Sequence, residues 1–437
     1  MKRNLVFGVA AAVLALNLLF GAWIYRADSA HGQARKDSIN ENVDLFADVL
    51  QKVRGEYVDA TNLTYHSLVY SALQGMVGRL DPHSEFLDAG DYRQLQDDTE
   101  GKFGGLGLDV EMRDGYITVL APMEDAPGFR AGILPGDRIT RIDGKNVGRM
   151  SLTEAVKELR GEPDTMVTVT IQRPLTGAVK DLTLKRAVIR VAMVKDINGR
   201  SEFPLVADNI GYVRITEFGD NTSAELENAL QKLNEHGMKV LILDLRGNPG
   251  GLLDEAVEVC QKFLPRGQLI VSTEGYDPAQ NSVRRAEGHG DELKGMPIVI
   301  LVNYSSASAA EIVAGCLQDL RRAIILGGQT FGKGSVQSIF PINDGAALKL
   351  TTAKYYTPSH KVIHEHGITP DIEVHMTREQ EEALLLKRVL GGLESLDATN
   401  RVLVEKIQDS QLARAEDLLK GIRLYEEMSN SENAAAK

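Results

Sequence analysis

The fold can be inferred from residues 240–263, which read VLILDLRGNPGGLLDEAVEVCQKF. The run that ends at Asp244 is continuously apolar, as is typical of a strand buried on both faces. The glycine-rich loop 245–251 follows it, and an apolar-periodic helix over 252–263 comes next. A strand, a loop and a helix in this order predict one unit of an α/β fold.

The same unit recurs further along the chain. The pattern predicts a strand over 297–302, a loop over 303–306, a helix over 308–320 and a further strand over 323–326. Buried strands that alternate with helices form a sheet whose loops gather at one edge. We therefore expect the functional residues in these loops.

Composition excludes several classes of protein. The 437 residues are 43% hydrophobic and 25% charged, which is ordinary for a globular chain of two to four domains and excludes a disordered or fibrous one. Sixty-one acidic and 49 basic residues give a net charge of -12, so nucleic acid is not an expected partner. The two cysteines, Cys260 and Cys316, are far apart in apolar segments, so neither a disulfide framework nor a cysteine-rich metal site is predicted.

The N-terminal segment 1–36 predicts a membrane anchor and a stalk. Two positive residues precede an apolar run over 5–24, which as a helix spans roughly 30 Å, one bilayer crossing. A cleaved secretory signal is the alternative, with Ala27 and Ala30 as small residues for a peptidase. Positive charges ahead of the span place the rest outside a bacterial inner membrane, in the periplasm.

Helical periodicity marks the regions 37–99 and 376–437 at the two ends of the remaining chain. For the C-terminal region, packing on the core is favoured over a dimer contact. The segments that carry the periodicity are 43–53, 65–80, 379–390 and 402–428.

Residues 100–187 predict a small β-rich domain. Strands are expected over 116–120, 138–142 and 166–172, separated by Gly, Pro and Asp turns. One helix begins at Ser151 in a capping box with Glu154, and it ends at Gly161.

Several glycine motifs of this domain, GGLGL at 104–108, AGI at 131–133, GDRI at 136–139 and IDG at 142–144, together resemble a PDZ domain. A glycine-rich turn with converging N–H groups can hold a terminal carboxylate, while the adjoining strand accepts the peptide as an added strand. By itself, the glycine run is more typical of a tight turn, and the other motifs are what favour the PDZ interpretation. The resemblance places the carboxylate on Gly105, Leu106, Gly107 and Leu108, with the groove between strand 108–110 and helix 151–160.

The sequence argues against three other kinds of functional site. Residues 327–333, GGQTFGK, fit seven positions of a phosphate-binding P-loop, but Gly334 replaces the required Ser or Thr and an alternating strand pattern follows. The chain has no G-x-G-x-x-G after a strand and no G-x-S-x-G. His360, His364 and His366 do not match a common metal spacing, so surface or packing roles are favoured. No metal or cofactor is predicted.

Ser308 and Lys333 are the remaining candidates for chemistry. Ser308 begins a helix after a buried strand, where a serine serves as an N-cap or, beside unpaired N–H groups, as a nucleophile. A lysine can be its base when burial populates the neutral amine. Lys333 lies between two glycines, which by themselves are typical of a surface turn. At strand periodicity Gln337 faces the same way as Lys333 and can orient its amine.

Three motifs in order resemble the C-terminal processing peptidases, or tail-specific proteases: DLRxNPGG at 244–251, SASAxEI at 306–312 and TFGKGSVQ at 330–337. LDPHS at 80–84 and QLxRA at 411–415 look like family features as well, and the resemblance covers 42–425. Ala310, where many relatives have serine, and Ser305, where they often have glycine, depart from the pattern. Neither position carries the chemistry.

The resemblance implies an α/β peptidase core over 188–375, with the β-loop-α fold of ClpP and crotonases and the PDZ domain inserted. It makes Ser308 the nucleophile, Lys333 the general base and Gln337 the residue that orients it, in acyl transfer through an acyl-enzyme. Ala309 and either Gly250 or Gly251 are the expected oxyanion donors, because glycine allows close backbone approach.

In such relatives an arginine at the PDZ helix end helps to gate the active site, and Arg160 matches it. The implied partners are proteins with exposed apolar C-termini, an adaptor or lipoprotein, and further copies of the chain. A catalytically silent, membrane-tethered PDZ scaffold is the main alternative. A transferase or isomerase would need an acyl-cofactor site that the sequence does not contain.

Overall fold

The computed structural model describes residues 38–59, 63–113, 115–123, 126–148, 150–174, 176–207, 209–288, 293, 295–388 and 398–435. It has two compact units, Met1–Leu80 and Asp81–Lys437. The described part of the first unit is helical, as predicted, with α2 (Ile39–Glu56) and α3 (Tyr65–Val77).

The predicted membrane span over 5–24 lies outside the described residues. Among the helices that the structure does describe, none has the length and apolar character needed to cross a bilayer.

The predicted α/β core is present in the second unit. Its central sheet has the order β10-β11-β12-β15-β16-β19. Only the β10–β11 pair is antiparallel, so the carboxyl ends of the other strands meet at one edge. The strands are β10 (Val194–Lys195), β11 (Ile210–Ile215), β12 (Val240–Asp244), β15 (Ile298–Val302), β16 (Ile324–Gly327) and β19 (Ile372–Glu373).

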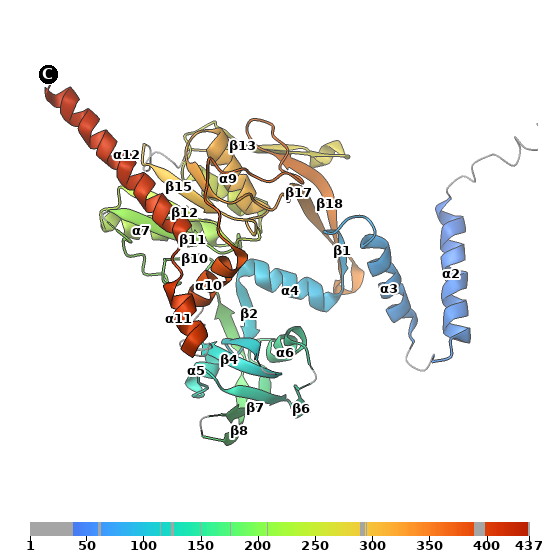
Figure 1. The fold of residues 1–437 in the computed structure, drawn as a ribbon. Coiled ribbons are helices and arrows are strands. Elements are labelled where there is room, and N and C mark those ends of the chain that lie inside the picture. Colours follow the sequence, from blue (N-terminus) through green and yellow to red (C-terminus); the bar gives the residue numbers. More distant parts are fainter. Residues whose placement is uncertain are drawn as a thin grey trace, which may run out of the picture. The chain divides into compact units, whose positions relative to one another are not determined.

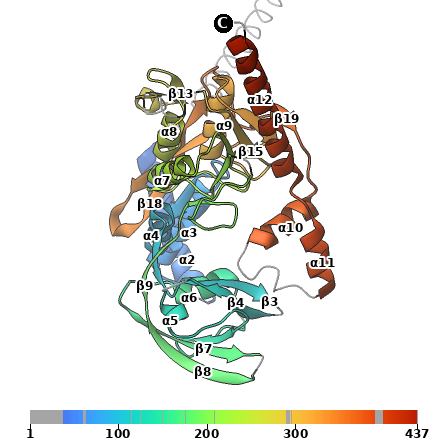
Figure 2. The same ribbon diagram turned by 90° about the vertical axis from the view of Figure 1, so that its left-hand side faces the viewer.

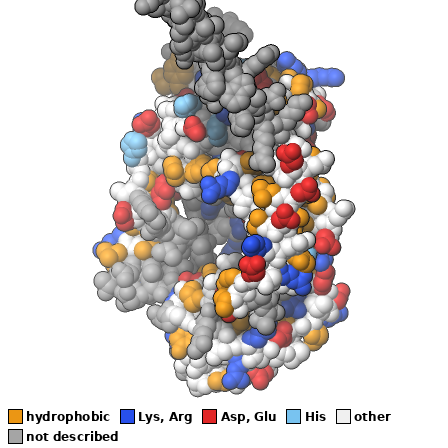
Figure 3. Space-filling view, turned by 90° about the vertical axis from the view of Figure 1, so that its right-hand side faces the viewer, with side chains coloured by type: hydrophobic (Ala, Val, Ile, Leu, Met, Phe, Trp, Pro, Cys, Tyr) orange, Lys and Arg blue, Asp and Glu red, His pale blue; other side chains and the backbone are white. Residues whose placement is uncertain are grey.

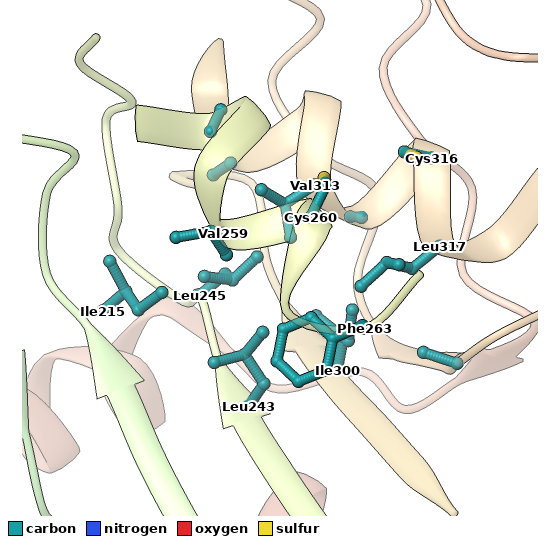
Figure 4. Close-up of a cluster of buried hydrophobic side chains, with 14 of the residues drawn as sticks. Ile215, Leu243, Leu245, Val259, Cys260, Phe263, Ile300, Val313, Cys316 and Leu317 are labelled. Carbon is teal, nitrogen blue, oxygen red and sulfur yellow. The ribbon is translucent and has the colours of Figure 1, made fainter. Parts of the chain in front are cut away.

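Helices cover both faces of this sheet (Figure 1). On one face, α7 (Thr222–Glu235), α8 (Leu253–Gln261) and α9 (Ala309–Asp319) bury the main hydrophobic core, part of which is drawn in Figure 4. On the other face, Ala415 and Leu419 of the C-terminal helix pack against the strands. Burial on both faces explains the continuous apolar runs of β12 and β15.

A second sheet with the order β1-β18-β13-β14, in which β17 pairs with β18, stands beside the core. Its first strand comes from the region 37–99, which we had expected to be entirely helical. Phe86 and Leu87 become buried when they pair with β18, and this long-range pairing leaves no mark on local periodicity. The elements are β1 (Glu85–Leu87), α4 (Ala89–Glu100), β13 (Leu269–Gly275), β14 (Ser282–Arg285), β17 (Ser335–Pro341) and β18 (Ala347–Tyr356).

The small β-rich domain has the predicted strands and helix. Its sheet order is β3-β4-β5-β7-β8, and a β2–β9 ladder leads to the core. Ser151 caps α6 (Leu152–Leu159), and the capping box with Glu154 is present. The other elements are β2 (Lys102–Gly105), β3 (Leu108–Arg113), β4 (Tyr116–Pro122), α5 (Pro127–Arg130), β5 (Arg138–Ile142), β6 (Lys145–Asn146), β7 (Met166–Arg173), β8 (Ala178–Lys185) and β9 (Ala187–Arg190).

The C-terminal region differs from the expected pair of helices. It forms α10 (Arg378–Arg388), α11 (Ala398–Lys406) and α12 (Ser410–Ala435), so the helix predicted over 402–428 is interrupted. Asp409 lies at the break, where its carboxylate accepts the N–H of Leu412 at 3.0 Å. As an N-cap, Asp409 starts a new helix. Figure 2 shows the change of direction between α11 and α12.

The two cysteines are neighbours in the fold, although they are far apart in the sequence. Cys260 of α8 and Cys316 of α9 are both fully buried free thiols, and each belongs to the same core cluster. Figure 4 shows both in the core. Sequence separation was therefore a poor guide to their proximity, because α8 and α9 pack side by side.

Candidate active site

Ser308 is the N-cap of α9, at the loop end of the buried strand β15. Its backbone has φ 54° and ψ -116°, a conformation that a residue with a side chain rarely adopts. Strain of this kind costs on the order of 1–3 kcal/mol and persists where the surroundings enforce it, often at functional sites.

A buried carboxylate enforces the conformation at Ser308. Glu311 is fully buried, and its Oε2 accepts the backbone N–H of Ser308 at 2.9 Å and that of Lys333 at 2.8 Å. Oε1 accepts the N–H of Gly332 at 2.7 Å and the Thr330 hydroxyl at 2.6 Å. Burial raises the pKa of Glu311, and these hydrogen bonds counteract that rise. Sequence analysis used Glu311 only as a motif residue and missed this clamp.

The predicted catalytic residues line one cavity of about 550 Å³. Ser308, Lys333 and Gln337 are on its wall, together with the predicted oxyanion residues. Apolar side chains from the core helices and residues of α4 complete the wall. The cavity is also lined by Glu100, Glu217, Asp220, Ile312, Lys349 and Tyr355.

Lys333 has the environment that a neutral amine requires. Burial lowers its pKa, the nearby Lys349 ammonium lowers it further, and the Glu311 carboxylate acts in the opposite direction. Within the described part of the chain, Lys333 Nζ makes no hydrogen bond or ion pair. Burial and the Lys349 charge both favour the uncharged form of the Lys333 amine.

Tyr355 lies beside both Lys333 and Ser308. Its buried phenol donates to the Lys333 carbonyl, and Ser308 lies near enough to affect the pKa of the same phenol. Burial raises the pKa of Tyr355 well above its usual range, so the phenol stays protonated. Sequence analysis did not find this residue, because its position in β18 has no local signature.

Gln337 reaches the cavity for a reason other than the predicted one. The strand β17 begins at Ser335, after Lys333, so strand alternation does not relate Gln337 to Lys333. The register shift between Val336 and Gln337 places an extra residue, Thr352, on the partner strand β18. The Gln337 amide donates to Ser335 Oγ at 3.0 Å and to Thr351 Oγ1 at 3.3 Å. Strand periodicity therefore did not justify placing Gln337 beside Lys333, although both line the cavity.

The turn at 80–84 supports this wall of the cavity. Asp81 accepts the Ser84 hydroxyl at 2.6 Å and the Thr351 hydroxyl at 3.1 Å. Burial alone would raise the pKa of Asp81, but these hydrogen bonds lower it. The motif LDPHS thereby anchors Thr351, to which Gln337 donates.

The structure distinguishes between the two candidate oxyanion glycines. Gly250 donates its N–H to Asn248 Oδ1 at 2.8 Å. The N–H groups of Gly251 and Ala309 have no acceptor among the described residues. A Cβ placed on Gly250 would lie only 2.5 Å from Ser308 Cβ, so Gly250 allows the loop to approach the serine. We therefore expect Gly251, rather than Gly250, to donate with Ala309.

In the segment that resembles a P-loop, backbone N–H groups donate to a side chain of the protein itself. The N–H groups of Gly332 and Lys333 point to the Glu311 carboxylate, so they do not form a phosphate cradle. Within the described ranges, no group of three or more His, Cys, Asp and Glu side chains is arranged to hold a metal.

The DLR motif meets the C-terminal QLxRA motif in a buried ion network. Arg246 is 5% exposed and binds Asp244 through Nε at 2.9 Å and Nη2 at 2.7 Å. It also donates to both carboxylate oxygens of Asp409 and to Gln411. The pKa of Arg246 is raised well above its usual range, because its carboxylate partners outweigh the opposing effect of burial. This network fastens the C-terminal region to the core.

Comparison with known proteins places the chain in a family. The family described as peptidase family S41 matches residues 209–374, and a PDZ domain matches residues 118–173. A carboxy-terminal-processing protease of Bartonella bacilliformis is 41% identical over 379 residues, which are 86% of this chain and 83% of that protein. The chain belongs to the carboxy-terminal-processing proteases of peptidase family S41. It is a serine protease with a PDZ domain.

Other members of this protease family are similar over most of the chain. A probable CtpA-like serine protease of Staphylococcus aureus is 36% identical over 361 residues, which are 82% of this chain and 70% of that one. The photosystem II D1 C-terminal processing protease aligns at 29% identity with a TM-score of 0.43, covering 79% of this chain and 96% of that one.

The predicted carboxylate-binding residues of the PDZ domain lie at one end of its sheet. Gly105 ends β2, Leu106 is buried, Gly107 has φ 64° and Leu108 begins the edge strand β3. An edge strand with a free side is what strand addition requires. The carboxylate-binding role remains a prediction.

Arg160 of the protease does not contact the catalytic residues. It donates to Asp98 Oδ1 of α4 at 2.9 Å and lies 4.3 Å from the centre of the Phe103 ring. The helix α4 also lines the catalytic cavity through Tyr92 and Leu95. The arginine therefore connects the end of α6 to a wall of the cavity, and its predicted gating role remains a prediction.

Proposed function

We propose that this protease cleaves exported proteins near apolar C-terminal tails through a Ser308–Lys333 dyad. The observation that carries the proposal is the Glu311 clamp, in which one buried carboxylate holds the backbone N–H groups of both residues at the same cavity. Such a clamp fixes the spacing of a nucleophile and a base.

The proposed reaction is acyl transfer. Neutral Lys333 takes the proton of the Ser308 hydroxyl while Oγ attacks the peptide carbonyl. The N–H groups of Ala309 and Gly251 stabilise the oxyanion. The C–N bond breaks, and the Lys333 ammonium protonates the leaving amine. Water, deprotonated by Lys333, then attacks the ester and releases Ser308.

Recognition and location belong to the same proposal. The PDZ domain binds the tail through residues 105–108, and Arg160 relays the bound state to α4. An anchor over 5–24 would hold the enzyme at the inner membrane with its catalytic part in the periplasm, where an adaptor or lipoprotein and further copies of the chain are its partners. Acidic and basic side chains are interspersed on the face drawn in Figure 3, and the net charge of -12 gives no support for a nucleic-acid partner.

The test is cleavage of an unstructured protein that ends in an apolar tail, by wild type, S308A and K333A. We expect both variants to lose cleavage by at least about 1,000-fold while retaining tail binding. If both variants cut as fast as wild type, the dyad is wrong. If wild type binds tails and does not cut them, the silent PDZ scaffold is correct.

A further inference from the structure

A second lysine shares the catalytic cavity with Lys333. Lys349 lines the same cavity from β18. Thr351 of the same strand accepts from the Gln337 amide, and Tyr355 donates to the Lys333 carbonyl, so this strand contacts the segment that carries Lys333 and Gln337. Lys354, by contrast, is exposed and is not among the described residues that line the cavity.

The charge of Lys349 is not cancelled by a partner. Its register neighbours are Glu85 on β1 and Ile339 on β17. Glu85 is exposed, and Lys349 forms no ion pair or side-chain hydrogen bond within the described ranges. A half-buried, unpaired ammonium acts over several ångströms because the surrounding protein screens it less than water does.

Lys333 is surrounded by few ionised groups that act on it. Glu311 lies beneath its backbone, and its effect is opposite to that of Lys349. His83 is adjacent, but its pKa is lowered, first by burial and then by Lys333, so it is mainly neutral at neutral pH. The other titratable groups that line the cavity are Tyr92, Glu100, Glu217, Asp220 and Tyr355, and Asp81 and His364 act on the neighbouring His83.

We infer that Lys349 is a positioning residue of the dyad, because its ammonium disfavours a second positive charge at Lys333 and so keeps the base unprotonated. This inference rests on the proposed function, since it requires Lys333 to be the base. Paired cationic groups activate amines in this way in other enzymes. The lowered pKa of Lys333, caused by burial and then by Lys349, agrees with the geometry.

The pH dependence of kcat/KM for a tail peptide tests the inference. Below the pKa of Lys333, activity falls about tenfold for each pH unit, because the neutral fraction falls in that proportion. Removal of the Lys349 charge raises that pKa. We expect K349M to shift the acidic limb to higher pH, with lower activity at neutral pH and wild-type activity on the alkaline plateau. K349E should shift the limb further.

Two control variants separate charge from structure. K349R keeps the positive charge, so its limb should coincide with that of wild type. K354M removes an exposed lysine of the same strand that does not line the cavity, and it should leave the profile unchanged. A further measurement needs no variant. Salt screens the partly exposed Lys349 more than the buried Glu311, so the wild-type limb should move to higher pH as salt is added.

An unchanged acidic limb in K349M, or a wild-type limb that ignores salt, would overturn the role of Lys349. Equal loss of activity at every pH would do so as well, because it indicates a structural effect. Full activity in S308A and K333A would instead overturn the proposed function. The two failures are therefore distinguishable in one set of assays.

Discussion

The Glu311 carboxylate receives the backbone N–H of Lys333 at 2.8 Å. Because the same oxygen also receives the N–H of Ser308, the two candidate catalytic residues are held by one buried side chain. The spacing of the two backbone segments is thus set by one side chain that lies outside the proposed reacting pair.

Replacement of this carboxylate tests the clamp. Glu311 accepts four hydrogen bonds, and E311Q replaces one of its acceptor oxygens with an amide N–H that can only donate. We expect kcat to fall about 10- to 100-fold, in keeping with the loss of a hydrogen bond to a charged group. E365Q, which changes an exposed glutamate in a neighbouring loop, should retain activity. Wild-type kcat in E311Q would contradict the clamp.

The same variant has a predicted pH signature in stability. Burial raises the pKa of Glu311 in the folded state, so the wild type loses stability as the pH rises through that pKa. E311Q cannot ionise and should gain stability relative to wild type over this range. Urea unfolding at several pH values measures the difference. A constant difference at every pH would contradict the raised pKa.

Gly250 is expected to tolerate no side chain. Its φ of 108° and the 2.5 Å approach of an added Cβ to Ser308 Cβ predict that G250A displaces the serine. A drop in kcat of about 100-fold or more is expected, similar to the loss of an oxyanion donor. G328A is the matched control, because an added Cβ there meets open space. The measurement is the acylation burst with an activated ester. A burst in G250A equal to that of wild type would show that the serine is undisturbed and would refute the prediction.

Variants of Arg160 and of its partner Asp98 test whether the PDZ domain communicates with the cavity. R160A and D98N both remove the 2.9 Å ion pair that joins the end of α6 to α4. We expect each to lower kcat/KM severalfold and to leave the Kd for a tail peptide unchanged. Equal loss of cleavage and tail binding would argue against a gating role.

Arg246 is expected to be essential for stability. R246M leaves the fully buried Asp244 carboxylate without its charged partner, which costs about 3–5 kcal/mol. R401M removes an exposed pair on α11 and should cost less than about 1 kcal/mol. Denaturant unfolding gives both values. Limited proteolysis should also release α12 first in R246M, and a wild-type cleavage pattern would contradict the fastening role.

The two thiols should be unreactive in the native enzyme. Both are buried, and burial raises the pKa of Cys260 well above its usual range, which suppresses the reactive thiolate. Ellman's reagent at neutral pH should detect no thiol before unfolding and two thiols after it. Rapid reaction of either cysteine in the folded protein would show that α8 and α9 open locally.

Local patterns predicted much of the fold. The apolar run of β12 and the capping box of Ser151 and Glu154 were sufficient to place their elements, because burial on both faces and helix capping are written in neighbouring residues. The break at Asp409 and the pairing of Phe86 were not predicted. The pairing of Phe86 depends on a strand far away in the chain, whereas the break at Asp409 is a local N-cap that helical periodicity alone does not reveal.

The sequence alone was enough to propose Ser308, Lys333 and Gln337, since their motifs are contiguous. Only the tertiary structure decided how they are controlled. Glu311, Tyr355 and Lys349 act at the cavity through contacts and charges between separate elements, and Gln337 reaches it from a strand that begins only after Lys333. The residue types determine which chemistry is available. The position and protonation state of these residues depend on burial, spacing and neighbouring charge, which exist only once distant segments meet.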